Sequence, residues 1–245
     1  MDHYKNAPLL LRKRIEILLA KLEVAIARES KVAFAHIISQ HPNLDIYAIG
    51  LFYRAESWDF VVPTFASEQG LQYVAENYAS DSIKKLNTIK TALRWSTCDS
   101  PHHDNEAFLH MMPVTKILLK EMSHTLDIAD PMYHQYQWPT HYADNYTLFY
   151  QFLIHVYQSI QNTVRLGLRE VWKSPSLRHY FVTQHCAVTL SCDGITHEAF
   201  LQHLRRLNTE ATYYQLKQEL TQVDLVNQQV RDAQDFLINE DWRGS

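Results

Sequence analysis

Residues 98–110 collect the side chains that most often perform chemistry: a cysteine, histidines and carboxylates. Cys98 stands four and five positions before His102 and His103, and a thiol beside an imidazole can form a reactive thiolate. A metal site needs three or four converging ligands, and adjacent histidines on a loop usually diverge. The stretch therefore predicts a solvated polar loop without a metal, and an enzyme site near Cys98, His102 and His103 is kept as an alternative.

Other sequence signatures of catalysis are incomplete or missing. His197 and Glu198 begin like the zinc motif HExxH, but Leu201 stands where the second histidine is required. The chain has no GxSxG nucleophile elbow and no glycine-rich phosphate loop. We therefore assign no catalytic residue, metal or cofactor, and the sequence leans away from an enzyme.

The segment 130–146 is rich in tyrosine and tryptophan and contains no lysine or arginine. Tyr and Trp are amphipathic and lose little entropy when fixed, so they commonly anchor protein interfaces, and acidic neighbours complement a basic partner. Two interpretations fit: the rings contact a partner, or they pack onto the body and close its core. The partner-binding residues predicted on the first interpretation are Asp130, Tyr133, Tyr136, Trp138, Tyr142 and Asp144.

Charge and composition exclude several classes. The chain has 23 Lys and Arg against 27 Asp and Glu, so it lacks the basic footprint of a general nucleic-acid binder. No stretch approaches the apolar length of a membrane span, and the first residues do not resemble a signal peptide. The odd, low count of three cysteines does not favour a disulfide framework. We expect a cytoplasmic protein that binds neither membrane nor nucleic acid.

The elements expected around these residues are mostly helical. Periodicity predicts helices over 8–40, 67–78, 112–126, 145–172, 197–207 and 209–237, and residues 239–245 are expected to fray. Ser67 is expected to cap the second of these helices, and Pro113 to lie in the first turn of the third. The apolar stripe predicted on the first helix consists of Leu11, Ile15, Leu18, Leu22, Ala25 and Val32. Aromatic and β-branched runs predict a hairpin of strands at 45–53 and 58–65, with Pro63 placing the second strand at an edge. A short strand at 91–96, a long strand at 177–192 and an irregular segment at 130–145 complete the prediction.

This order predicts an α+β fold, in which a small, mainly antiparallel sheet is covered by several long helices. No Pro/Gly/Ser-rich linker or change of composition interrupts the chain. The prediction is therefore a single domain over residues 1–245.

Four fragments carry a family resemblance: residues 47–53 (YAIGLFY), 67–71 (SEQGL), 93–96 (LRWS) and 204–208 (LRRLN). In this order they resemble the bacterial family described only as domain of unknown function 4303, over about residues 8–220. The resemblance implies an N-terminal helix, a strand hairpin, a helix start, a short Trp-containing strand and a C-terminal Leu-Asn element. It supplies no catalytic residue, and the aromatic segment 130–146 departs from it.

Small bacterial families without a catalytic signature often resemble immunity proteins of toxin systems, which act by binding. By this analogy the sequence predicts a protein-binding module, an immunity protein that neutralises a cognate toxin by occlusion. The alternatives are a hydrolase-like enzyme near Cys98 and a structural or regulatory subunit that self-associates through its long helices.

Overall fold

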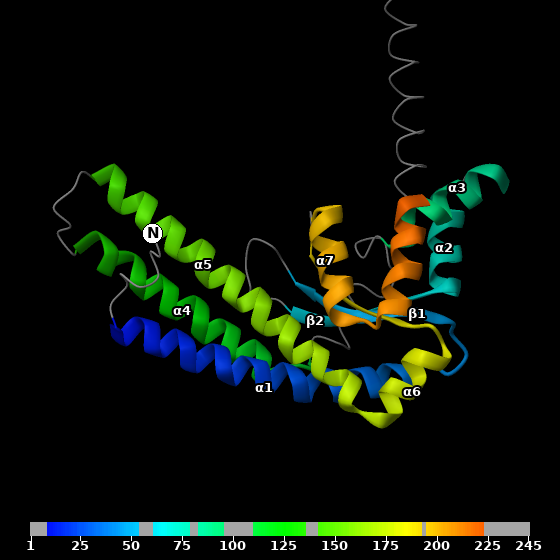
Figure 1. The fold of residues 1–245 in the computed structure, drawn as a ribbon, viewed down its shortest axis with the longest axis horizontal. Coiled ribbons are helices and arrows are strands. Elements are labelled where there is room, and N and C mark those ends of the chain that lie inside the picture. The colour runs from blue at the N-terminus through cyan, green and yellow to red at the C-terminus, as the bar shows by residue number, and fades with distance from the viewer. Residues whose placement is uncertain are drawn as a thin grey trace, which may run out of the picture.

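The computed structural model describes residues 9–53, 61–78, 83–95, 110–135, 142–192 and 195–222, and within these only the backbone of 83–85, 128–135, 142–148 and 197. The elements are α1 (Leu9–Gln40), β1 (Ile46–Tyr53), β2 (Val61–Ser67), α2 (Glu68–Tyr78), α3 (Ile83–Leu93), α4 (Pro113–Gln135), α5 (Tyr142–Arg169), the 3-10 helix η3 (Glu170–Lys173), α6 (Pro175–Thr183), β3 (Ala187–Cys192) and α7 (His197–Leu207). A further helix covers 210–222. Figure 1 shows their arrangement.

A three-stranded sheet has the strand order β2-β1-β3, and α1, α4 and α5 extend beyond it on one side (Figure 1). β1 pairs with β2 as an antiparallel hairpin, as predicted, and Pro63 lies on the edge strand opposite Leu51. β1 pairs with β3 in parallel, which places Tyr53 beside Cys192. The α+β class is confirmed, but the sheet is mixed, whereas the sequence predicted a mainly antiparallel one.

Gly50 is the point where β1 and β3 approach most closely. A Cβ atom there would lie 2.0 Å from the carbonyl oxygen of Thr189. Such a distance is far inside van der Waals contact, so the pairing of the two parallel strands requires glycine at this position.

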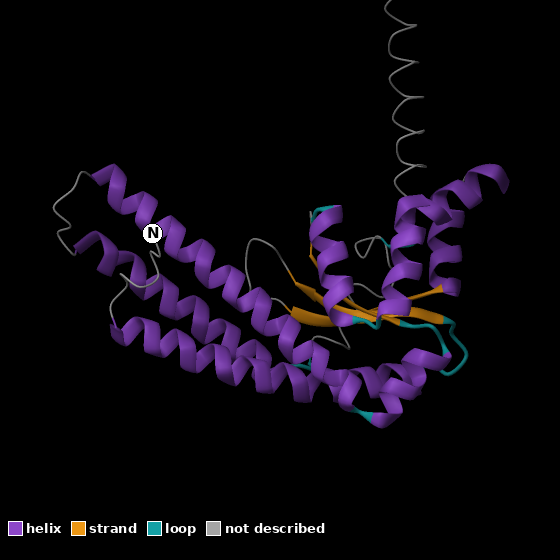
Figure 2. Cartoon of the chain, in the orientation of Figure 1, coloured by secondary structure: helices purple, strands orange, loops and turns teal. Residues whose placement is uncertain are grey.

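Helices cover both faces of the sheet (Figure 2). The main core joins α1, α4, α5 and η3 to one face through fully buried side chains such as Ile26, Phe34, Phe152 and Leu51. A smaller core on the other face joins α7 and the 210–222 helix to Ala187 of β3. The predicted stripe on the first helix is buried at Leu11, Ile15, Leu18, Leu22 and Ala25. Val32 was also expected in this stripe, but its side chain is 66% exposed.

The start of α4 is held by a carboxylate from α1. Pro113 begins the helix, as predicted, and has no N–H to satisfy. The next two backbone N–H groups, of Val114 and Thr115, each donate to the carboxylate of Glu29 over 2.9 Å. The N–H of Lys116 donates to the carbonyl of Met112. Glu29 therefore supplies the N-terminal cap that α4 lacks in its own sequence.

Three predicted elements are wrong. The short strand expected at 91–96 is replaced by the end of α3 and a turn, because the apolar residues there continue a helix. The long strand expected at 177–192 is α6 followed by β3, separated by His185 with a positive φ of 50°. The irregular segment expected at 130–145 is helical up to Gln135 and again from Tyr142.

Candidate functional site: a cationic groove

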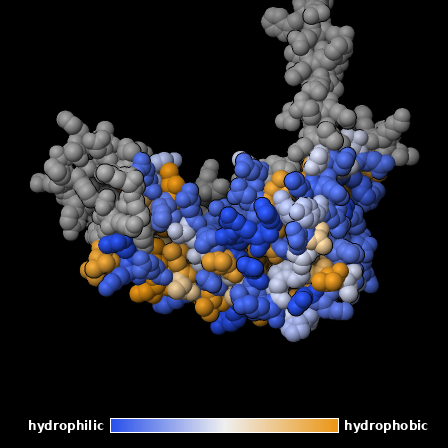
Figure 3. All heavy atoms as spheres, viewed as in Figure 1, coloured by the Kyte–Doolittle hydropathy of each residue, from blue (hydrophilic) through white to orange (hydrophobic). Residues whose placement is uncertain are grey.

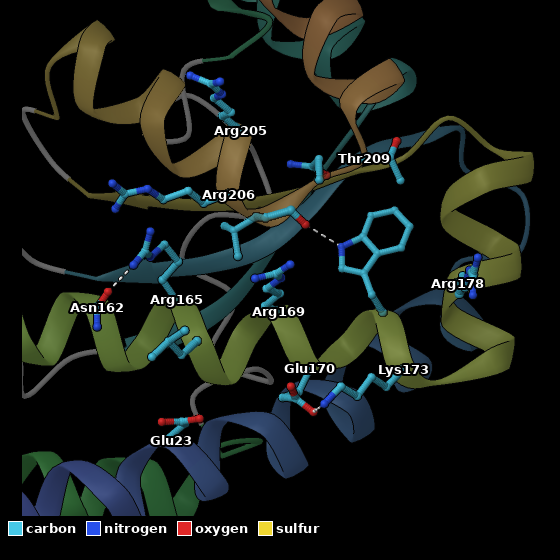
Figure 4. Close-up of a pocket in the computed structure, with 14 residues that line it drawn as sticks. Glu23, Asn162, Arg165, Arg169, Glu170, Lys173, Arg178, Arg205, Arg206 and Thr209 are labelled. Carbon is cyan, nitrogen blue, oxygen red and sulfur yellow. Dashed lines mark hydrogen bonds and ion pairs between the residues drawn. The ribbon is translucent and has the colours of Figure 1, made fainter.

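An open groove of about 1060 Å³ lies where α5, η3, α6 and α7 meet (Figure 4). Six of its lining residues carry positive charge and two carry negative charge, Glu23 and Glu170. The cations are Arg165, Arg169, Lys173, Arg178, Arg205 and Arg206. The groove is therefore strongly cationic in a chain whose formal net charge is -4.

Helical spacing places these cations. Arg165, Arg169 and Lys173 follow one another at intervals of four residues along α5 and η3, so they share one helix face. Arg205 and Arg206 stand in the last turn of α7, where the negative end of the helix dipole favours positive charge. The two sets come from opposite sides of the groove (Figure 4).

The groove floor is held rigidly by side chains that bond to the backbone. The indole Nε1 of Trp172 donates to the carbonyl of Leu207 over 2.6 Å. The side chain of Asn208 accepts from the backbone N of Val188 over 2.7 Å and donates to the Val188 carbonyl over 2.8 Å. Asn208 thus pairs with β3 as a neighbouring strand would. Leu207 and Asn208 form the Leu-Asn element noted in the sequence, which therefore joins α7 to the sheet.

Like charges in the groove are close enough to perturb one another. Burial, and then the positive charges of Arg206 and Arg169, lower the pKa of Arg165. Arg165 donates to the neutral side-chain amide of Asn162. Within the described part of the chain, Arg165, Arg169 and Arg206 form no ion pair, whereas Lys173 is paired with Glu170 at 2.8 Å. An anion bound among the three arginines would relieve this repulsion.

A buried polar chain lies directly behind the groove. The side-chain nitrogen of Gln161 donates to the hydroxyl of Tyr53 over 2.8 Å and lies 3.1 Å from Nε2 of His203. His203 is 8% exposed, and burial together with the charges of Arg165 and Arg206 lowers its pKa to about 4. The imidazole is neutral at pH 7, and the Gln161 donor assigns its proton to Nδ1, which has no partner among the described residues.

The chemistry that the described groove offers is that of its arginines. An imidazole with a pKa of about 4 is a weak base at pH 7. No group of three or more His, Cys, Asp and Glu side chains is placed to hold a metal in the described residues. Guanidinium groups bind carboxylates and phosphates bidentately.

The residues predicted from the sequence fall elsewhere. Asp130 and Tyr133 are in the last turns of α4, and Tyr142 and Asp144 begin α5, but their side chains are outside the description. Tyr136, Trp138, Cys98, His102 and His103 also lie outside the described residues. The partner-binding interpretation of 130–146 and the enzyme alternative both remain predictions.

The groove was missed because its charges are distributed over three segments. The net charge of -4 gives no sign of the five arginines and one lysine at 165, 169, 173, 178, 205 and 206. The four-residue spacing at 165–173 and the adjacent pair at 205–206 were available signals. Only folding, which places α7 over α5, turns these separate signals into one cationic surface.

The structure defines an α+β protein with a cationic groove between α5, η3, α6 and α7 in its described part. The sequence model of the family described as Domain of unknown function (DUF4303) matches residues 26–159. The chain belongs to this family, as the fragments at 47–53 and 67–71 indicated. No curated protein and no solved structure matches the chain.

The matched range contains the C-terminal half of α1 from residue 26, the β1–β2 hairpin, α2, α3, α4 and part of α5. Every residue that lines the groove lies outside this range. Among the helices that the structure describes, none has both the length and the apolar character required to cross a lipid bilayer.

Proposed function

We propose that this chain is a protein-binding module that holds an acidic segment of its partner in the cationic groove. The observation that carries the proposal is the group of Arg165, Arg169 and Arg206, whose charges are not neutralised by a described carboxylate. Charged groups held close together without counter-charges are costly to the free protein. An acidic ligand offsets that cost, so the groove favours a carboxylate-bearing partner.

Three features favour a short acidic protein segment over a nucleic acid. The chain as a whole carries a net charge of -4, which opposes the approach of a long polyanion. Glu23 and Glu170 line the groove and interrupt any extended basic track. The indole of Trp172 packs against the main core, with an edge-to-face contact to Phe181 at 5.1 Å, so it is not a free platform for base stacking.

The more specific form of this proposal is an immunity protein that neutralises a cognate bacterial toxin in the cytoplasm. It rests on the analogy with small binding families that lack a catalytic signature. An inhibitor of this type acts by covering its target and performs no chemistry. In this form, an acidic loop of the toxin occupies the groove, and the rest of the chain blocks access to the toxin's active site.

Binding to the groove is tested by titrating the purified chain with a fluorescent oligo-glutamate peptide. Arg169 and Arg206 are the exposed members of the group of three arginines. The double variant R169E/R206E is expected to bind the peptide at least tenfold more weakly, since each substitution removes an attraction to the peptide and adds a repulsion. The control K116E/K120E makes the same charge change on the exposed face of α4 and is expected to leave binding within about twofold. Equal loss in both variants, or tighter binding of an oligo-dT probe than of the peptide, would contradict the proposal.

The immunity function needs a second experiment. The wild-type chain and R169E/R206E are used as baits in lysates of the cells that naturally produce the chain. A protein captured by the wild type alone is then assayed with and without the chain. Inhibition by the wild type, but not by the variant, supports the immunity function. A captured protein whose activity is unchanged on binding leaves the binding module intact but rejects the immunity function.

A further inference from the structure

Helix α1 has a second apolar stripe that the fold does not bury. Leu10 is 82% exposed, Ile17 56% and Val24 69%. A surface helix of a globular protein normally has charged and polar residues on the face opposite its core. Here exposed apolar residues recur on the face opposite the core over residues 10–24, nearly half of a 32-residue helix. Figure 3 shows hydrophobic side chains along this side of the molecule.

The exposed stripe has the spacing of a coiled coil. Leu10, Ile17 and Val24 are seven residues apart, as are the a positions of a heptad repeat, and Lys31 ends the series. The corresponding d positions are Lys13, Ala20 and Ala27. Alanine at two d positions leaves little bulk between two helices, so their backbones can approach closely.

The stripe points directly away from the core. Successive residues of an α-helix turn by about 100°, which places Leu10, Ile17 and Val24 on the side opposite the fully buried Ile15 and Leu22. Residues flanking this stripe are exposed too, including Glu16 and Lys21. α1 also forms the outer edge of the bundle in Figure 1, so a second helix can lie along it.

Charges beside the stripe are sorted by sign. The e positions are Arg14, Lys21 and Arg28, and the g positions include Glu16 and Glu23. In a parallel pair of helices, each g position faces the e position five residues later on the partner helix. Glu16 then faces Lys21 of a second copy. Because the pair is two-fold symmetric, Lys21 of the first copy also faces Glu16 of the second. In an antiparallel pair, e faces e and g faces g, so like charges repel.

We infer that α1 associates with α1 of a second copy of this chain as a parallel two-stranded coiled coil. The apolar residues Leu10, Ile17 and Val24 form the seam, and the Glu16–Lys21 contacts set the parallel direction. A hollow of about 530 Å³ between α1 and η3, lined in part by Val24 and Ala27, gives the partner helix further contact area. The seam residues Leu10, Ile17 and Val24 do not line the acidic-partner groove, whereas Glu23 and Glu170 line both that groove and this hollow.

The apolar seam is tested by sedimentation equilibrium of the full chain over a range of concentrations. The wild type is expected to form dimers, and V24D to raise the dissociation constant by at least about tenfold. V182D makes the same change at a site of similar exposure on α6, and its dimerisation is expected to match the wild type. Circular dichroism of each variant confirms that the fold is retained. A monomeric wild type at every concentration up to its solubility limit overturns the inference, as does equal weakening by V24D and V182D.

The direction of the helices is tested by exchanging charges at one pair. Glu16 and Lys21 are chosen because Glu23 lines the groove and Arg28 adjoins the buried Glu29. E16K and K21E each place like charges together in the parallel dimer and are expected to weaken self-association several-fold. An equimolar mixture of E16K and K21E, and the double variant E16K/K21E, are expected to restore it. Stronger self-association of either single variant, or no recovery in the mixture, overturns the parallel arrangement.

Discussion

Replacing Glu29 with alanine removes the cap of α4 and is expected to destabilise the whole fold. Glu29 is 6% exposed, and its carboxylate accepts both free N–H groups of the first turn, from Val114 and Thr115. Alanine leaves these donors without a partner at a junction that water reaches poorly. α4 then loses its anchor to α1, one of the main helix contacts in the bundle.

The expected magnitude follows from the burial of the two donors. An unsatisfied buried donor costs about 1–3 kcal/mol, and the Thr115 N–H is buried. The Val114 N–H is only partly buried, so its loss is placed at the lower end of that range. The sum is about 3 kcal/mol in the free energy of unfolding. For a chain of this size this corresponds to a fall in Tm of roughly 6–12 °C.

Thermal unfolding followed by circular dichroism measures the effect. E29Q keeps one acceptor oxygen and is expected to lose about half as much stability as E29A. E76A makes the same Glu→Ala change at an exposed site on α2 and is expected to shift the free energy of unfolding by no more than about 0.5 kcal/mol. If E29A unfolds within a degree of the wild type, the carboxylate is not the cap of α4. If E29Q and E29A unfold together, the loss is not graded by the number of acceptors.

Three further outcomes are expected. Gly50→Ala would place a Cβ 2.0 Å from the Thr189 oxygen, so the yield of folded protein should fall sharply; a yield and Tm equal to wild type would refute this close approach. Asn208→Asp replaces the nitrogen that donates to the Val188 carbonyl with an oxygen, so the free energy of unfolding should fall by about 2 kcal/mol. Chemical denaturation measures this loss, which should exceed that of an Asn→Asp change at an exposed site. The pKa of His203 is about 4 when folded and higher when unfolded, so its neutral form contributes stability that is complete above about pH 6.5 and is lost as pH falls towards 4. That loss is at most about 3 kcal/mol; H203Q should flatten it, and an unchanged slope would argue against a depressed pKa.

The sequence predicts those parts of the fold that local chemistry determines. The hairpin is set by two aromatic and β-branched runs, and Pro63 correctly marks the edge strand. Ser67 was expected to cap the next helix, and its hydroxyl accepts from the N–H of Gly70 over 3.1 Å. Pro113 correctly marks the start of α4. Pro63, Ser67 and Pro113 each act on the local backbone, and for this reason their effects could be predicted from the sequence.

The errors lie where neighbouring signals conflict. The dipeptide Ser174–Pro175 is a typical helix start, with proline at the first helical position. The alternation of apolar and polar residues that follows it also fits a strand, and the structure resolves the conflict in favour of α6. The pairing of β3 with β1 depends on packing between distant segments, so no local pattern predicts its parallel direction.

The candidate site was the least predictable feature. An interface was expected from a dense aromatic segment, because such residues are easily noticed in a sequence. The groove instead combines arginines from α5 and α7, which are separated by β3 and α6 along the chain. The net charge of the whole chain does not reveal this local excess of positive charge. A search for cations that repeat every four residues would have found only Arg165, Arg169 and Lys173 on α5 and η3.

The parallel pairing of β1 with β3 has a consequence for how the chain is made. Residues 54–186 are synthesised after β1 and before its second neighbour begins. At ribosomal rates of 5–20 residues per second, that interval is roughly 7–27 s. During this time one edge of β1, which is rich in apolar and aromatic residues, has no strand to pair with. The nascent chain is therefore exposed to aggregation for longer than its short hairpin suggests, and covering that edge during synthesis is a natural role for a chaperone.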